Sequence, residues 1–237
     1  MRKTIVDEML KTYLESQEIK QMIANTPELR NKFILQFLAE SGCRVSELLG
    51  IKLSDIDFDR GMVLIRHLKA GLKKKCPGCG RSAGRHQPFC SKCGKDLSKI
   101  KPEGSDERTR LINISKNTLK LCNEYLNGRG KDSEYLIPLT RQMILYIVRG
   151  AAQSIGLGGP VMLNPETGKK HHVHPHIFRT SLAVDWLNIS GEDASMQKAL
   201  QEQLGHKRFD TTMRYHKLRP STVRKIGDDV RRRRFGE

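Results

Sequence analysis

The chain has 237 residues, enough for one domain with a sizeable core or for one domain with a small accessory module. Its 43 Lys and Arg residues outnumber its 26 Asp and Glu residues, so the formal net charge is +17. This excess predicts a polyanionic partner, because basic side chains that neutralise phosphates release condensed counterions. A solvated basic surface is the alternative interpretation.

The sequence has no features of a membrane or secreted protein. Its longest apolar stretches, around 33–38 and 143–148, are far too short to span a bilayer, and the N-terminus lacks the apolar region of a secretory signal. We therefore expect a cytoplasmic protein associated with DNA in the nucleoid, with no membrane partner.

The N-terminal part of the chain is predicted to be helical from Thr4 to about Glu40. Thr26-Pro27-Glu28 is typical of a helix start, with an N-cap hydroxyl, a proline at the first helical position and an acid in the first turn. The helix that follows runs into Gly42, where a residue in the left-handed conformation would end it. A second short helix is predicted over Val45–Leu49.

Two strands follow, Met62–Leu68 and Thr109–Ser115, and a turn at Arg60-Gly61 leads into the first. An insertion rich in Lys, Gly and Cys separates them. The rest is mostly helical, with a loop at 156–170 and apolar residues three to four apart in five segments, 118–126, 140–154, 175–188, 194–204 and 221–234. We predict a mainly α fold with a small antiparallel β-hairpin (α+β) that carries an inserted module.

The insertion contains two segments of one form, Cys-x-x-Cys-Gly, at Cys76, Cys79 and at Cys90, Cys93. A two-residue spacing lets both thiolates face one ion, and the glycine lets the backbone turn so that amide N–H groups point at the sulfurs. This pattern predicts a structural four-cysteine Zn²⁺ site in a compact zinc ribbon. Four thiolates leave no open coordination position, so this zinc should fold the module and take no part in catalysis.

The remaining cysteines and the charge of the module have simpler interpretations. Cys43 and Cys122 fall on apolar helical segments and are interpreted as core thiols. Basic residues on and beside the module suggest a hypothesis, that it also contacts phosphates.

Four short motifs contain residues suited to phosphodiester chemistry. They are SGCRVSELLGIKLSDID around Arg44, HPHIFRTSLAVDWL with His176 and Arg179, LGH with His206, and Tyr215 nine residues after that histidine. Each residue alone would more often be solvated or packed than catalytic. Together they resemble, in order, spacing and flanking residues, the catalytic domain of the tyrosine recombinase family (phage integrase and Xer-like proteins). The resemblance covers about Thr26 to Leu218.

The resemblance implies a DNA strand transferase in which Tyr215 attacks a phosphodiester and forms a covalent 3′-phosphotyrosine. Arg44 and Arg179 would neutralise the non-bridging oxygens, since a guanidinium binds phosphate through paired bonds and stays charged. His176 is the candidate base or orienting group, and His206 a donor to the phosphate. Because the covalent intermediate conserves the bond energy, no nucleotide cofactor is expected, and the sequence contains no Gly-rich phosphate loop.

The family also uses a lysine on the β-hairpin as general acid for the leaving 5′-oxygen. Lys69, before Ala70-Gly71, fits this position best, although Lys73, Lys74 and Lys75 remain alternatives because the insertion lies in the same hairpin. Glu47 matches the family's Arg-x-x-Glu spacing and is expected to orient a neighbouring basic group.

The domain organisation predicted from these features has three parts. An N-terminal helical segment spans 1–25, the catalytic domain spans 26–218 with the zinc ribbon at 73–104, and a basic C-terminal helix or tail spans 219–237. Only about twenty-five residues precede the family-like region, too few for the core-binding domain of typical members. A second departure is Thr180-Ser181, where the family usually has a His followed by Thr or Ser.

The predicted partners are double-stranded DNA and further copies of the chain, as a homo-oligomer, a tetramer on paired sites. The basic C-terminal segment either docks on a neighbouring protomer, as the resemblance implies, or adds affinity for DNA. A site-specific recombinase or integrase is the first hypothesis. Two others are a type IB topoisomerase-like enzyme that nicks and reseals, and a non-catalytic DNA-binding regulator derived from a recombinase, although the complete residue set opposes the latter.

Overall fold

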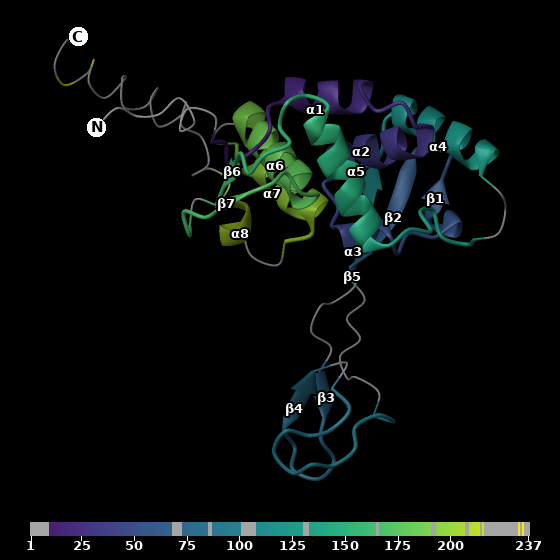
Figure 1. Ribbon diagram of the computed structural model, residues 1–237, viewed down its shortest axis with the longest axis vertical. Helices are drawn as coiled ribbons and strands as arrows, with labels where there is room; N and C mark the ends of the chain where they lie inside the picture. The colour runs from purple at the N-terminus through teal and green to yellow at the C-terminus, as the bar shows by residue number, and fades with distance from the viewer. Residues whose placement is uncertain are drawn as a thin grey trace. The chain divides into compact units, whose positions relative to one another are not determined.

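A computed structural model describes residues 10–67, 73–84, 87–100, 108–129, 133–164, 166–190, 193–206, 209–213, 215, 232 and 234. The chain divides into two compact units (Figure 1). The main unit is formed by Met1–Ile65 with Arg110–Glu237, and the insertion unit by Arg66–Thr109. The predicted 73–104 module falls within the insertion unit.

The main unit is mostly helical. Its helices are α1 (Ser16–Ala24), α2 (Leu29–Ser41), α3 (Val45–Leu48), the 3-10 turn η2 (Leu53–Asp55), α4 (Lys116–Gly128), α5 (Arg141–Gln153), α6 (His176–Ser190), α7 (Ala194–Leu204) and α8 (Phe209–Met213). Strands β1 (Ile56–Asp57), β2 (Met62–His67) and β5 (Arg108–Asn113) form one sheet in the order β1-β2-β5, and β6 (Met162–Leu163) pairs with β7 (Lys170–His171). The predicted α+β class is confirmed. Among the described residues, no helix is long and apolar enough to cross a membrane.

Helix α2 lies at the centre of the main unit and packs against α1, α4, α5 and α6 (Figure 1). It is buried on most of its sides, as expected of a helix enclosed by others; its buried residues are Phe33, Ile34, Leu35, Phe37, Leu38 and Ser41. Gly42 ends it with φ +59°, which confirms the predicted left-handed cap.

The predicted start of this helix was wrong. Helix α2 begins at Leu29 after Glu28, and Thr26 is not its N-cap. The Thr26 hydroxyl donates instead to the carbonyl oxygen of Met22 at 2.7 Å, so it satisfies the last turn of α1. Thr26-Pro27-Glu28 therefore lies between the end of α1 and the start of α2, and the Thr26 hydroxyl caps the C-terminal turn of α1.

The three-stranded sheet contains both predicted hairpin strands, with shifted ends. Strand β5 ends at Asn113, and Ser115 leaves the predicted strand to act as the N-cap of α4, where its hydroxyl accepts from the amide of Thr118. The turn before β2 uses Gly61 at φ +67°. Leu68, the last residue of the predicted first strand, lies outside the described residues.

A second small hairpin was not predicted. The segment 156–170 was interpreted as a loop, but Met162 pairs with His171 and Leu163 with Lys170 in antiparallel register. Met162 is fully buried, and the amide of Leu163 donates to the Lys11 carbonyl oxygen at 2.7 Å. The strands are too short for a sequence pattern and are held by this contact with the N-terminal segment.

The Thr180-Ser181 pair has a packing role in α6. The buried Ser181 hydroxyl accepts a hydrogen bond from the amide of Leu14 at 2.8 Å, and Thr180 donates to the His176 carbonyl oxygen at 3.3 Å. Ser181 therefore satisfies a buried backbone donor of the segment before α1.

We expect Ser181→Ala to lower the free energy of unfolding by about 1–3 kcal/mol, because the Leu14 amide would stay buried without an acceptor. Urea unfolding monitored by circular dichroism measures the loss. Ser133→Ala is the matched control: its hydroxyl accepts the Tyr135 amide at an exposed site, so water replaces it and the change should stay within about 0.5 kcal/mol. Equal losses in the two variants would contradict the prediction.

Candidate active site and cysteine cluster

Arg44 lies at the N-cap of α3, two residues after the left-handed Gly42. Its Nη1 donates to Glu47 Oε1 at 2.9 Å, and its backbone amide donates to Glu47 Oε2 at 2.9 Å. The Glu47 side chain is 1% exposed, whereas that of Arg44 is 35% exposed. Glu47 thus anchors both the backbone and the side chain of Arg44, as the Arg-x-x-Glu spacing predicts, while the guanidinium reaches the surface.

Arg179 lies in the first turns of α6 and is almost completely buried, at 1% exposure. Its Nη1 donates to the Gly42 carbonyl oxygen at 2.9 Å and its Nη2 to that of Leu204 at 2.6 Å. Within the described residues, its Nε has no hydrogen-bond partner. Burial and then the nearby Arg44 lower the pKa of Arg179, yet a guanidinium starts so high that it stays charged.

His176 and His206 stand in the field of both arginines. Burial, followed by Arg179 and Arg44, lowers the pKa of His176. The same causes in the same order lower the pKa of His206 to about 3. Both imidazoles are therefore neutral at pH 7, the form that accepts a proton on one nitrogen and donates from the other.

His206 follows the left-handed Gly205 that ends α7, and its Nδ1 lies 2.9 Å from the hydroxyl of the buried Thr212 on α8. The Tyr215 ring is half-buried and stacks beside the His206 ring, with centroids 6.0 Å apart and planes 19° apart. It also packs on a cluster formed by α6 and α7, whose members are Ala183, Leu187, Leu200 and Leu204.

The structure thus brings five of the six predicted catalytic residues into one region of the main unit. Lys69 lies outside the described residues. Of its alternatives, Lys74 is buried in the insertion unit and donates to the Leu97 carbonyl oxygen at 2.7 Å, so its ammonium supports the module itself.

Sequence reasoning missed one residue of this region, Arg110 on β5. It donates to both carboxylate oxygens of Glu47 and lies next to the His206 segment. A signal was present in the alternation of the strand: Leu111 is 60% exposed and Ile112 is buried, so Arg110 shares the inward face with Ile112.

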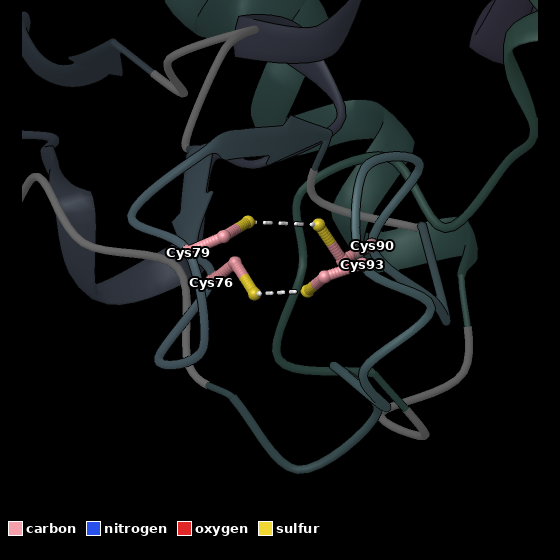
Figure 2. A group of neighbouring side chains, drawn as sticks. All are labelled: Cys76, Cys79, Cys90 and Cys93. Carbon is pink, nitrogen blue, oxygen red and sulfur yellow. Dashed lines mark hydrogen bonds between the residues drawn. The ribbon is translucent and has the colours of Figure 1, made fainter.

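The four predicted cysteine ligands form one cluster in the insertion unit (Figure 2). Their sulfurs all lie within 4.8 Å of one another, with Cys76 and Cys93 at 3.4 Å and Cys79 and Cys90 at 3.5 Å. A regular ZnS₄ tetrahedron with bonds of about 2.3 Å has edges of about 3.8 Å, so the cluster has the size that such a site needs.

The two knuckles repeat the same local geometry. Gly80 and Gly94 take φ +68° and +70° and donate back to the carbonyl oxygens of Cys76 and Cys90. Amide groups point at sulfur in both, from Gly78 to Cys76 at 3.4 Å and from Lys92 to Cys90 at 3.5 Å. The Lys92 amide is the largest cause that lowers the pKa of Cys90 to about 6. The Lys95 amide also lowers the pKa of Cys93, but hydrogen bonds with Cys76 and Cys79 outweigh it and raise that pKa to about 12.

Known proteins of one family share this architecture. The model of the phage integrase family matches residues 12–83 and 90–221. The tyrosine recombinase XerC of Roseiflexus sp. (strain RS-1) is 31% identical over 211 residues, which cover 89% of this chain and 52% of that protein. The tyrosine recombinase XerA of Thermococcus onnurineus (strain NA1) is 25% identical over 242 residues, 98% of this chain and 67% of that protein. The chain thus spans about half to two thirds of the length of these relatives.

Solved structures agree on the fold. The crystal structure of XerA recombinase matches with a TM-score of 0.59 at 22% identity, over 94% of this chain and 66% of that one. The catalytic domain of bacteriophage HP1 integrase matches with a TM-score of 0.51 at 15% identity, over 92% of this chain and 94% of that domain. The matched residues include all four motifs, from Arg44 to Tyr215, and on this ground the chain belongs to the phage integrase family.

Proposed function

We propose that the chain is the catalytic part of a site-specific DNA recombinase or integrase, which cuts and rejoins strands through a covalent 3′-phosphotyrosine at Tyr215. The observation that carries the proposal is the pair of bonds from Arg179 to the carbonyl oxygens of Gly42 and Leu204. These bonds hold the segments of Arg44 and His206 against the helix that carries His176 and Arg179. Tyr215 stacks on His206 at the edge of this group.

The chemistry follows from the charges of these side chains. Two guanidiniums stabilise the negative charge that develops on the non-bridging oxygens as the tyrosyl oxygen attacks phosphorus. The phenol proton passes to a base, for which neutral His176 is the candidate. The bond from phosphorus to the 5′-oxygen breaks, and that oxygen takes a proton from a general acid, for which Lys69 is the candidate.

His206 is proposed to donate to a non-bridging oxygen. If the Thr212 hydroxyl donates to Nδ1, the ring proton stays on Nε2, which is then available to the phosphate. Rejoining is the reverse reaction, with a 5′-hydroxyl attacking the phosphotyrosine, so the sequence of steps needs no nucleotide cofactor.

For the insertion unit we propose a zinc ribbon with one structural Zn²⁺ held by Cys76, Cys79, Cys90 and Cys93. The sulfur distances and the amide groups that point at sulfur support this metal, since four thiolates in a tetrahedron suit zinc. In this proposal the domains are those expected from the sequence: 1–25, the catalytic domain 26–218 with the ribbon at 73–104, and 219–237.

The proposed partner is double-stranded DNA bound by a homo-oligomer, a tetramer on paired sites. The net charge of +17 supports a polyanionic partner. One structural neighbour is XerH site-specific recombinase bound to a palindromic difH substrate in a post-cleavage complex. A palindromic site presents two equivalent half-sites, which suits symmetric binding by copies of one chain.

Tyr215→Phe should abolish the covalent protein–DNA adduct on a nicked suicide duplex, because the phenolic oxygen is the proposed nucleophile. Denaturing gel electrophoresis of labelled duplex carrying the cognate site measures the adduct. Tyr146→Phe, a change in an exposed tyrosine of α5, serves as the matched control and should form adduct as wild type does. If Tyr215→Phe forms the adduct, or if wild type forms none, the proposed reaction is wrong.

The lowered pKa of His206 predicts that the protein becomes less stable as the pH falls below neutral. The pKa of His206 is about 3 in the folded state and about 6.5 in the unfolded state. The stabilisation of the folded state by neutral His206 is therefore complete above pH 6.5 and is lost as the pH falls from 6.5 towards 3, because the unfolded state binds the proton first. Between pH 7 and pH 5, we expect the free energy of unfolding of wild type to fall more than that of His206→Asn, which lacks the titrating group. Urea unfolding at both pH values measures it, and an unchanged difference would contradict the assignment.

Purified protein should contain one zinc per chain, and chelation should remove the amide-exchange protection of residues 73–100. Cys79→Ser should lose the metal because three thiolates hold zinc more weakly than four. Cys122→Ala, a buried thiol of the main unit, should keep it. Metal content by elemental analysis and hydrogen exchange by mass spectrometry test this; a metal-free insertion unit with unchanged protection would refute the site.

A further inference from the structure

Arg110 is a largely buried arginine on β5 that none of the four motifs contains. Its side chain is 10% exposed, and it belongs to the main unit as the first residue after the insertion unit. A buried arginine needs acceptors for its donors, and the identity of those acceptors indicates what the residue does.

The first acceptor is Glu47. Arg110 Nη2 donates to Oε2 at 2.9 Å and Nη1 to Oε1 at 3.3 Å, so the guanidinium faces the carboxylate with both ends. Glu47 also receives Nη1 of Arg44. Two guanidiniums therefore share one buried carboxylate, and the three side chains together carry a net charge of +1.

The other contacts reach the segment of His206. Arg110 Nε donates to the Gln203 carbonyl oxygen at 2.9 Å. At Gly205, where φ is +66°, an added Cβ would lie 2.9 Å from Arg110 Nη1 and 3.4 Å from its Cδ and Cζ. The guanidinium thus packs directly against the turn that leads into His206.

We propose that Arg110 is a positioning residue that fixes Arg44 and His206 relative to each other, an inference that rests on the proposed function. It anchors Glu47, which orients Arg44, and the same guanidinium holds the turn before His206. It also keeps the group positive, because Arg44 and Glu47 alone would form a neutral pair next to the phosphate. Only a planar fork with several donors makes these contacts at once, so lysine is a poor replacement.

The test compares cleavage with DNA binding for Arg110→Met and Arg110→Lys. Single-turnover adduct formation on the nicked suicide duplex should slow by about 100-fold in Arg110→Met, the loss typical of a reacting group displaced by about 1 Å. Arg110→Lys should recover only part of the rate. The dissociation constant for the same duplex should change by no more than about threefold, because the Arg110 side chain is only 10% exposed and faces Glu47.

A second substrate separates positioning from general damage to the fold. A duplex with a methylphosphonate at the scissile position lacks one negative non-bridging oxygen, so it depends less on a well-placed Arg44. The ratio of wild-type to Arg110→Met rates should fall from about 100 to below about 10 on this duplex. A variant that is only partly folded would lose the same factor on both substrates.

Arg129→Met is the matched control, since Arg129 also holds backbone carbonyl oxygens, those of Ser133, Tyr135 and Leu136. It contacts none of the proposed catalytic residues that the structure describes. Its rate ratio should be equal on both duplexes. If Arg110→Met cleaves at the wild-type rate, or loses the same factor on both duplexes, the inference about Arg110 is overturned while the recombinase proposal stands. If wild type forms no adduct, both are overturned.

Discussion

A buried guanidinium, that of Arg179, joins three segments that are far apart in the sequence. It lies on α6 and donates to the carbonyl oxygen of Gly42, which precedes Arg44, and to that of Leu204, which precedes Gly205 and His206. Removing a charge from water is costly, and hydrogen bonds must compensate for it. Here the compensation requires both carbonyl oxygens to be in place, so the fold of each segment is coupled to that of the others.

The two buried arginines of this region are compensated in different ways. Arg110 faces the Glu47 carboxylate, which it shares with Arg44, whereas Arg179 faces only the dipoles of backbone carbonyl groups. Among the described residues its Nε lacks an acceptor, which normally costs about 1–3 kcal/mol. Under the proposed function a scissile phosphate adds acceptors and negative charge to this group, so part of the energy spent in folding is recovered on binding DNA.

The sequence predicted what depends on local pattern. Gly42 was identified as a helix end because few other residues adopt its φ, and α7 was predicted with its observed bounds from the spacing of its apolar residues. Thr26 was misassigned because a hydroxyl between two helices can serve either, and only the three-dimensional path decides. Arg110 was missed because its role depends on hydrogen bonds to Glu47 and Gln203, which are 63 and 93 residues away in the sequence.

The proposed zinc site and the entropy of loop closure affect the stability of the insertion unit in different ways. Among its described residues, the core of this unit consists of little more than Ala83 and Leu97 beside the cysteines, too few apolar groups to fold a segment of this size. Under the proposed zinc site the sulfurs are therefore both core atoms and metal ligands. The buried Lys74 ammonium donates to the Leu97 carbonyl oxygen, as a neighbouring strand would in a larger domain. Loop-closure entropy grows only logarithmically, by about 0.6 kcal/mol for each doubling in length. An unfolded insertion between β2 and β5 would therefore weaken their pairing only slightly, and the contacts of Arg110, which lie wholly in the main unit, should survive loss of the metal.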